Sequence, residues 1–233
     1  MRTAHRFVVL LIIVCLPALS LGSPIVDRQF DGNFNDDAGG STIVVHPDCP
    51  ADPCNSSSIF DTDEFGTFWQ WESENPRGGG FTLRTNVELG DTFTIRLVFS
   101  FDEVSSFRKI IDFKDRESDN GLYFNSGYIR FWPLSRSGET FMAGEVLELV
   151  VARNGIDNQL VVFVVDGNDT FISLDMNDTA DLAIATTDAG ESILGFFHDD
   201  IATASEGTSG GKVYLLQILD RFEPQIFRSR FEG

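Results

Sequence analysis

The chain has 233 residues, and its 42% hydrophobic and 23% charged side chains exclude a largely disordered protein. Its formal net charge of −19 disfavours binding to nucleic-acid phosphates and to anionic lipid headgroups. Such an acidic surface suits solubility, divalent cations, or neutral and cationic partners.

The first 22 residues have the pattern of a secretory signal peptide. Arg2 and Arg6 precede an unbroken apolar run at 7–16, and a proline and several small residues follow it. A membrane-spanning helix is the alternative, but such a helix needs about 20 apolar residues, and this run has ten. No later segment is long and apolar enough to cross a bilayer. We therefore expect a secreted protein, extracellular or periplasmic.

Patterns typical of β-strands recur through the rest of the chain. In the clearest one, at 93–101, Phe, Ile and Leu alternate with mostly polar residues, so one face would pack on a core. Both faces of the segment 212–219 are mostly apolar, which is typical of a central strand. The pattern predicts a sandwich of two antiparallel sheets in one domain at 24–222, followed by a short tail at 223–233. Further strands are predicted at 68–71, 81–87, 108–113, 121–124, 128–132, 146–153, 159–165, 170–174 and 193–198.

Two of the three cysteines, Cys49 and Cys54, lie outside the predicted signal peptide. An even number of cysteines in an exported protein predicts a disulfide bond, which here would close a short loop. A zinc site is the weaker alternative, because it would need more ligands nearby than His46 alone.

Three segments together resemble the concanavalin A-like lectin/glucanase superfamily, in its laminin G-like bacterial branch. They are FDGNFNDDAGG at 30–40, LELVVARNGIDNQLVVFVVDG at 147–167, and ILGFFHDDIATASEGTSGGKVYLLQILD at 193–220. The resemblance implies an all-β fold, a two-sheet antiparallel jelly-roll sandwich that covers most of the mature chain. It implies no single activity, because this fold carries lectins, hydrolases and adhesion domains.

The resemblance also implies a calcium site in the loops at the rim of the sandwich. Asp199 and Asp200 are the first candidate ligands, and Glu206 lies in the same acidic segment. Asp31 would join them if the opening and closing segments pair. Calcium prefers several oxygen ligands, which this set could supply. A solvated acidic loop without metal is the alternative.

Aromatic side chains are the candidates for sugar contacts. Trp69 and Trp71 share one face of their predicted strand, and so do Tyr128 and Trp132 if that segment is extended. Packing in the core is the alternative for each of them.

Motifs for catalysis are missing from the sequence. Glycoside hydrolases of this fold carry acids spaced like E-x-D-x-x-E on one strand, and this chain has no such strand. No G-x-S-x-G motif and no glycine-rich phosphate-binding loop occur either.

We therefore expect a secreted, non-catalytic module that binds carbohydrate or a cell-surface or matrix partner, with calcium assisting. A glycan-active hydrolase or lyase with atypical catalytic residues is one alternative. A structural or adhesion protein without a small ligand is another.

Overall fold

The computed structural model describes residues 23–45, 58–72, 79–166, 169–203 and 209–223. The predicted signal peptide, Cys49, Cys54 and Glu206 lie outside these residues. No helix in the described part of the chain is long and apolar enough to span a membrane.

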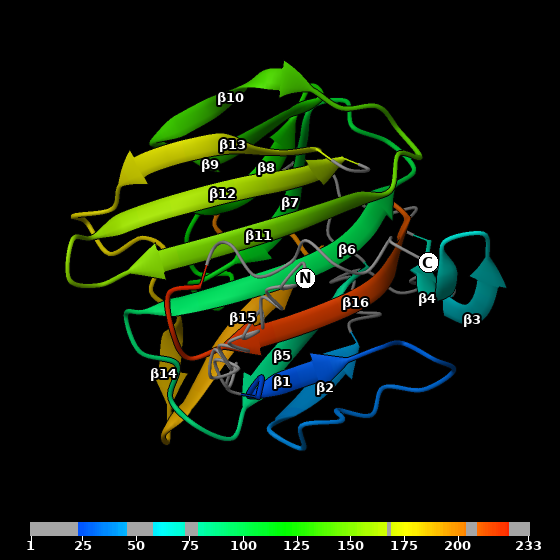
Figure 1. The fold of residues 1–233 in the computed structure, drawn as a ribbon, viewed down its shortest axis with the longest axis horizontal. Helices are drawn as coiled ribbons and strands as arrows, with labels where there is room; N and C mark the ends of the chain where they lie inside the picture. Colours follow the sequence, from blue (N-terminus) through cyan, green and yellow to red (C-terminus); the bar gives the residue numbers. More distant parts are fainter. Residues whose placement is uncertain (1–22, 46–57, 73–78, 167–168, 204–208, 224–233) are drawn as a thin grey trace, which may run out of the picture.

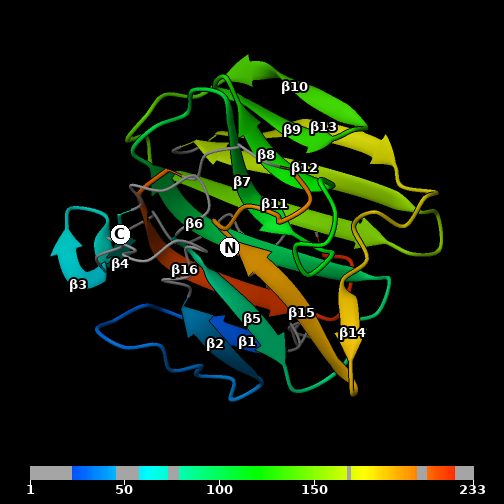
Figure 2. The ribbon, with the colours of Figure 1, turned by 180° about the vertical axis from the view of Figure 1, so that it is seen from behind.

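Every regular element of the described residues is a β-strand, and the strands form two antiparallel sheets that pack face to face (Figure 1, Figure 2). The predicted two-sheet sandwich is thereby confirmed. The front sheet, toward the viewer in Figure 1, contains β13 (Asp169–Asn177), β12 (Gln159–Asp166), β11 (Leu147–Asn154), β6 (Phe93–Phe101), β16 (Gly211–Leu219), β4 (Gly66–Trp71) and β3 (Ser58–Asp63) in this order, with β1 (Val26–Arg28) beside β16. The back sheet, toward the viewer in Figure 2, contains β10 (Ser135–Thr140), β9 (Tyr128–Trp132), β8 (Gly121–Asn125), β7 (Phe107–Asp112), β15 (Glu191–Phe196), β5 (Phe81–Thr85) and β2 (Ser41–Val45), with β14 (Thr186–Asp188) beside β15.

Strands β6 and β16 form the centre of the front sheet. Every residue of β6 is buried, and Leu97 lies between Leu149 of β11 and Leu216 of β16 in the register of the sheet. Because side chains alternate along a strand, its Phe, Ile and Leu residues face the back sheet while Arg96, Val98 and Ser100 point outward. The prediction that 212–219 is a central strand is confirmed as well.

The two ends of the described domain meet in the front sheet. Strand β1 runs antiparallel to β16, with Val26 opposite Ile218 and Arg28 opposite Leu216. Long-range pairing of this kind closes the sandwich and leaves β16 with neighbours on both sides.

Each predicted strand is present, although several bounds differ by a few residues. The strands that the sequence pattern missed are β1, β2, β3, β10 and β14. Strands β2, β3 and β10 lie at sheet edges, where a strand is partly exposed and rich in polar residues, as β10 is. In these edge strands the alternation of apolar and polar residues is weak, because neither face of the strand is fully buried.

Aromatic rings fill much of the space between the sheets. Trp71 stacks on Phe197 with ring centroids 4.5 Å apart, and Phe99 lies 5.2 Å from the same Phe197. Phe81 stacks on Phe196 at 5.2 Å. Aromatic pairs add specific geometry to the burial of apolar area, so this layer fixes how the two sheets face each other.

Replacement of Phe99 by alanine tests the importance of this aromatic layer. Phe99 is fully buried, so the Phe99→Ala variant should lose about 3–5 kcal/mol in free energy of unfolding, as measured by urea denaturation. The matched control is Phe65→Ala, because Phe65 is 53% exposed and its loss leaves no cavity. Equal destabilisation of the two variants would contradict this account of the core.

Candidate functional site

The outer face of the front sheet is hollowed where the β3–β4 hairpin stands beside β16. Two neighbouring hollows, of about 340 and 590 Å³, share Phe65 and Tyr214 as lining residues. Gln29, Asp31 and Arg96 also line the first hollow, and Asp63, Asp102 and Lys212 also line the second. Volumes of this size are typical of sites for small ligands or single sugar units.

Strand β4 of the hairpin pairs with β16 through the backbone, and an aromatic and a charged side-chain contact add to this pairing. The ring of Phe68 lies 5.5 Å from that of Tyr214, and the ammonium group of Lys212 lies 4.2 Å above Phe68. Lys212 Nζ and the Tyr214 hydroxyl both donate hydrogen bonds to Asp63 Oδ2, at 2.8 and 2.9 Å. These contacts bring Phe65, at the tip of the hairpin, to a ring distance of 6.4 Å from Tyr214.

Backbone conformation at the hairpin tip depends on one glycine. Gly66 has a φ of 128°, a region that glycine adopts without the steric cost that a side chain would bring. This turn places the side chain of Phe65 outside the core, where it is half exposed. Phe65 and Tyr214 thus form an aromatic wall between the two hollows.

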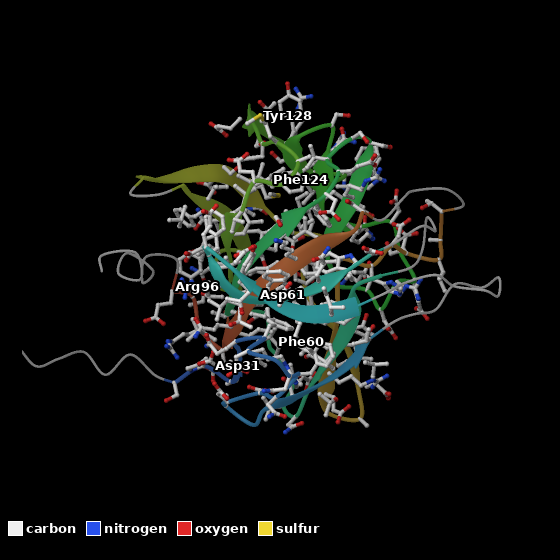
Figure 3. All side chains as sticks on the ribbon, turned by 90° about the vertical axis from the view of Figure 1, so that its right-hand side faces the viewer. Asp31, Phe60, Asp61, Arg96, Phe124 and Tyr128 are labelled. Carbon is white, nitrogen blue, oxygen red and sulfur yellow. The ribbon has the colours of Figure 1, made fainter. Side chains whose placement is uncertain are left out.

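Polar side chains with planar groups surround the first hollow. Arg96 Nε donates a hydrogen bond of 2.6 Å to Glu148, and Arg96 Nη1 donates one of 3.2 Å to Gln217. Gln217 in turn donates to Asp27 at 3.0 Å. In Figure 3, Arg96 and Asp31 lie on the left of the molecule, which is the outer face of the front sheet. The network fixes the guanidinium group of Arg96 beside the hollow, where it can meet the oxygen atoms of a ligand.

The two aspartates that line the second hollow have different protonation behaviour. Burial opposes the ionisation of Asp63, but the hydrogen bonds from Lys212, the Phe65 amide and Tyr214 outweigh it and lower the pKa of Asp63. Burial raises the pKa of Asp102, and the neighbouring charge of Glu72 adds to this effect, while Lys212 opposes it. The second hollow therefore contains one carboxylate that ionises easily and one that retains its proton to higher pH.

Trp69 and Trp71 do not form the sugar platform that the sequence suggested. Their side chains are 0% and 1% exposed and stack on each other in the core, with ring centroids 5.3 Å apart. Trp71 Nε1 donates a hydrogen bond to the carbonyl of Ser209. They share a strand face as expected, but that face is the interior of the sandwich, so the prediction that they contact a ligand is wrong.

Tyr128 and Trp132 lie elsewhere, on the outer face of the back sheet. Both are half-buried, whereas Ile129 and Phe131 between them belong to the core. The guanidinium group of Arg136 lies 4.4 Å from the Tyr128 ring, and that of Arg130 lies 4.2 Å from the Trp132 ring. Figure 3 shows Tyr128 at the top of the molecule, away from Arg96 and Asp31. The two predicted aromatic pairs therefore do not form one site.

The predicted calcium ligands are divided between the two faces. Asp31 lines the first hollow with Arg96, whereas Asp200 contacts Lys109 and Tyr123 of the back sheet. No group of three or more His, Cys, Asp or Glu side chains in the described ranges is arranged to hold a metal ion. Since Glu206 lies outside the described residues, calcium binding stays a prediction.

Asp200 has a structural role that the sequence did not reveal. Its Oδ2 accepts hydrogen bonds from Lys109 Nζ at 3.2 Å and from the Tyr123 hydroxyl at 3.3 Å. Its Oδ1 accepts them from the backbone amides of Ala202 and Thr203. Lys109 also pairs with the buried Asp112 at 2.9 Å. A cation bound to Asp200 would have to compete with Lys109 for the same carboxylate.

Comparisons with known proteins agree with the sandwich architecture. The chain matches no protein-family model, and no curated protein matches it. The binding domain of botulinum neurotoxin serotype D/C is similar in structure, with a TM-score of 0.57 and 12% identity over 86% of this chain and 49% of that chain. The receptor binding domain of botulinum neurotoxin D matches with a TM-score of 0.53 and 11% identity, over 86% of this chain and 50% of that one.

A sialidase matches with a TM-score of 0.51 and 10% identity, over 84% of this chain but only 19% of the sialidase. This chain therefore spans about half the length of the neurotoxin domains and a smaller part of the sialidase. At these identities the likeness shows a shared fold alone.

Acid should destabilise the protein through Asp200. Burial opposes its ionisation, but Lys109 and the bonds from Thr203 outweigh this and lower the pKa of Asp200. A lowered pKa in the folded state contributes stability above the unfolded value of about 4, and this contribution is lost as the pH falls through the folded value. We expect the free energy of unfolding to fall below about pH 4, as measured by urea denaturation between pH 7 and pH 2.

The Asp200→Asn variant should be less stable at pH 7 and should lose less stability in acid than the wild type. Glu139→Gln is the control, because Glu139 is exposed and its side chain contacts no other described residue in a hydrogen bond or ion pair. An unchanged acid slope in Asp200→Asn would show that another carboxylate dominates.

Proposed function

We propose that the protein is a secreted, non-catalytic carbohydrate-binding module that holds a glycan against the outer face of its front sheet. The observation that carries this proposal is the pair of hollows on either side of Phe65 and Tyr214. A sugar ring offers an apolar face to an aromatic side chain and a rim of hydroxyl groups to planar polar ones. The wall and the polar side chains around it supply both kinds of contact.

The polar groups around the hollows suit hydroxyl ligands. Arg96 and Lys212 donate hydrogen bonds, Asp31 and Asp63 accept them, and Gln29 can do both. Burial and the nearby Asp63 raise the pKa of Tyr214, so its hydroxyl stays neutral over the physiological range. Structural likeness to a receptor binding domain and to a sialidase supports this proposal at the level of the fold.

The exposed wall residue gives a direct test. The Phe65→Ala variant should bind the best oligosaccharide from a glycan array about tenfold more weakly than the wild type, because it loses an aromatic contact at the centre of the site. Isothermal titration calorimetry measures the affinity.

Ile156→Ala is the matched control, since Ile156 is a 90% exposed apolar residue at the turn between β11 and β12. The proposal is wrong if no glycan binds, or if the two variants bind equally well.

A glycan-active hydrolase is a second candidate, because Asp63 and Asp102 line one hollow and have pKa values shifted in opposite directions. Glycosidases use one carboxylic acid to protonate the leaving group and one carboxylate as base or nucleophile. In such a hydrolase, Asp102 would be the general acid, and the ionised Asp63 would be the base or nucleophile.

The candidate predicts release of reducing ends from a bound glycan, and at least a hundredfold slower release in Asp102→Asn. Asp61→Asn is the control, since Asp61 is an exposed acid on the same hairpin. Absence of release from every glycan that binds would leave the binding module as the function.

A further inference from the structure

Two arginines face each other on the outer surface of the back sheet. Arg130 of β9 and Arg136 of β10 are direct partners in the register of the antiparallel pair. Cross-strand neighbours have β-carbons only about 5 Å apart, and like charges in this position repel each other. An acidic protein has many carboxylates with which to relieve such repulsion, yet none among the described residues forms an ion pair with either arginine.

Neither arginine has a hydrogen bond or an ion pair with any residue in the described part of the chain. Every other described lysine and arginine donates to a carboxylate, a carbonyl or a hydroxyl, as Arg84 does to Asp188, and Arg84 also forms an ion pair with Glu191. Nε of Arg130 is buried and has no hydrogen-bond partner among the described residues. The positive charge of this pair is therefore available to a ligand.

Aromatic rings hold the two guanidinium groups in place. Arg136 lies over Tyr128, and Arg130 lies 4.2 Å from the ring of Trp132 and 5.9 Å from that of Phe107. Trp132 and Phe107 are themselves in contact at 5.8 Å. A guanidinium group stacked on a ring keeps its N–H groups in the plane free to donate, in the fork geometry that matches a carboxylate or a sulfate.

We propose that this surface, which we term the arginine pair, binds the anionic group of an acidic glycan. A carboxylate or sulfate ester on a sugar would accept hydrogen bonds from Arg130 and Arg136, and the sugar ring would lie along Tyr128 or Trp132. The site is on the other sheet from the two hollows and does not depend on the function proposed for them.

Net charge favours a glycan over other polyanions. The chain carries 36 acidic and 17 basic residues, so a densely charged nucleic acid or lipid surface is repelled by the protein as a whole. An isolated anion on a largely neutral sugar chain can reach the arginine pair without bringing further negative charge to the protein. The aromatic rings beside the pair add contacts that a bare phosphate could not use.

The test compares polysaccharides that differ in charge alone. We expect the full chain to bind a sparsely de-esterified pectin, in which most galacturonates remain methyl esters and a few carry a free carboxylate, but not its fully methyl-esterified form, as measured by calorimetry at low and at physiological salt. A dextran that carries only a few sulfate esters, compared with unsubstituted dextran, forms the second pair and decides whether sulfate serves as well as carboxylate. Arg136→Gln should weaken binding to the charged member by about tenfold, and the double variant with Arg130→Gln should abolish it.

Arg84→Gln is the control for loss of charge. Arg84 lies on the same sheet in β5 and is already neutralised by Asp188 and Glu191, so its replacement should change the affinity less than twofold. Equal binding of the charged and the esterified polymer would overturn the proposal. So would an equal effect of Arg84→Gln and Arg136→Gln, or binding of phosphatidylserine vesicles but of neither acidic polysaccharide. Arg136 is exposed, so its variant tests the site even if Arg130→Gln does not fold.

Discussion

The burial of both faces of β6 is the constraint on which the rest of the structure depends. Alternation sends its Phe, Ile and Leu side chains into the aromatic layer between the sheets, and it must then send Arg96 and Ser100 to the other face. A buried arginine needs partners, and Glu148 and Gln217 on the neighbouring strands supply them. The polar network beside the first hollow is thus a consequence of how the core is built.

The position of the second hollow also follows from which side chains of a central strand, here β16, point outward. Lys212 and Tyr214 project outward from β16 on either side of Val213, which faces the core, and a register irregularity after Val213 brings Leu215 to the outer side as well. Lys212 and Tyr214 both bind Asp63, which ties the β3–β4 hairpin to the sheet and carries Phe65 into position. The backbone pairing of β4 with β16 and the bonds to Asp63 together hold this hairpin in place, so in the proposed module ligand affinity and hairpin stability would be coupled.

Local pattern was sufficient to predict the sandwich and its central strands, but not the site. The alternation at 93–101 and the two apolar faces of 212–219 indicate buried strands directly. Polar edge strands such as β10 have no comparable apolar pattern in the sequence. Alternation showed that Trp69 and Trp71 share a face but not that this face is the interior. The wall of Phe65 and Tyr214 depends on the pairing of β4 with β16, which are far apart in the chain and which no local signal connects.

Charge distribution distinguishes the two faces of the sandwich. On the front sheet each described cation that borders the hollows is paired with a carboxylate, as Arg96 is with Glu148 and Lys212 with Asp63. On the back sheet, Arg130 and Arg136 stack on aromatic rings instead, and a ring holds a cation without cancelling its charge. In a chain this acidic, aromatic support is a means of keeping a positive surface, because any nearby carboxylate would neutralise it. The two proposals therefore concern chemically different surfaces, one proposed for hydroxyl groups and one for anions.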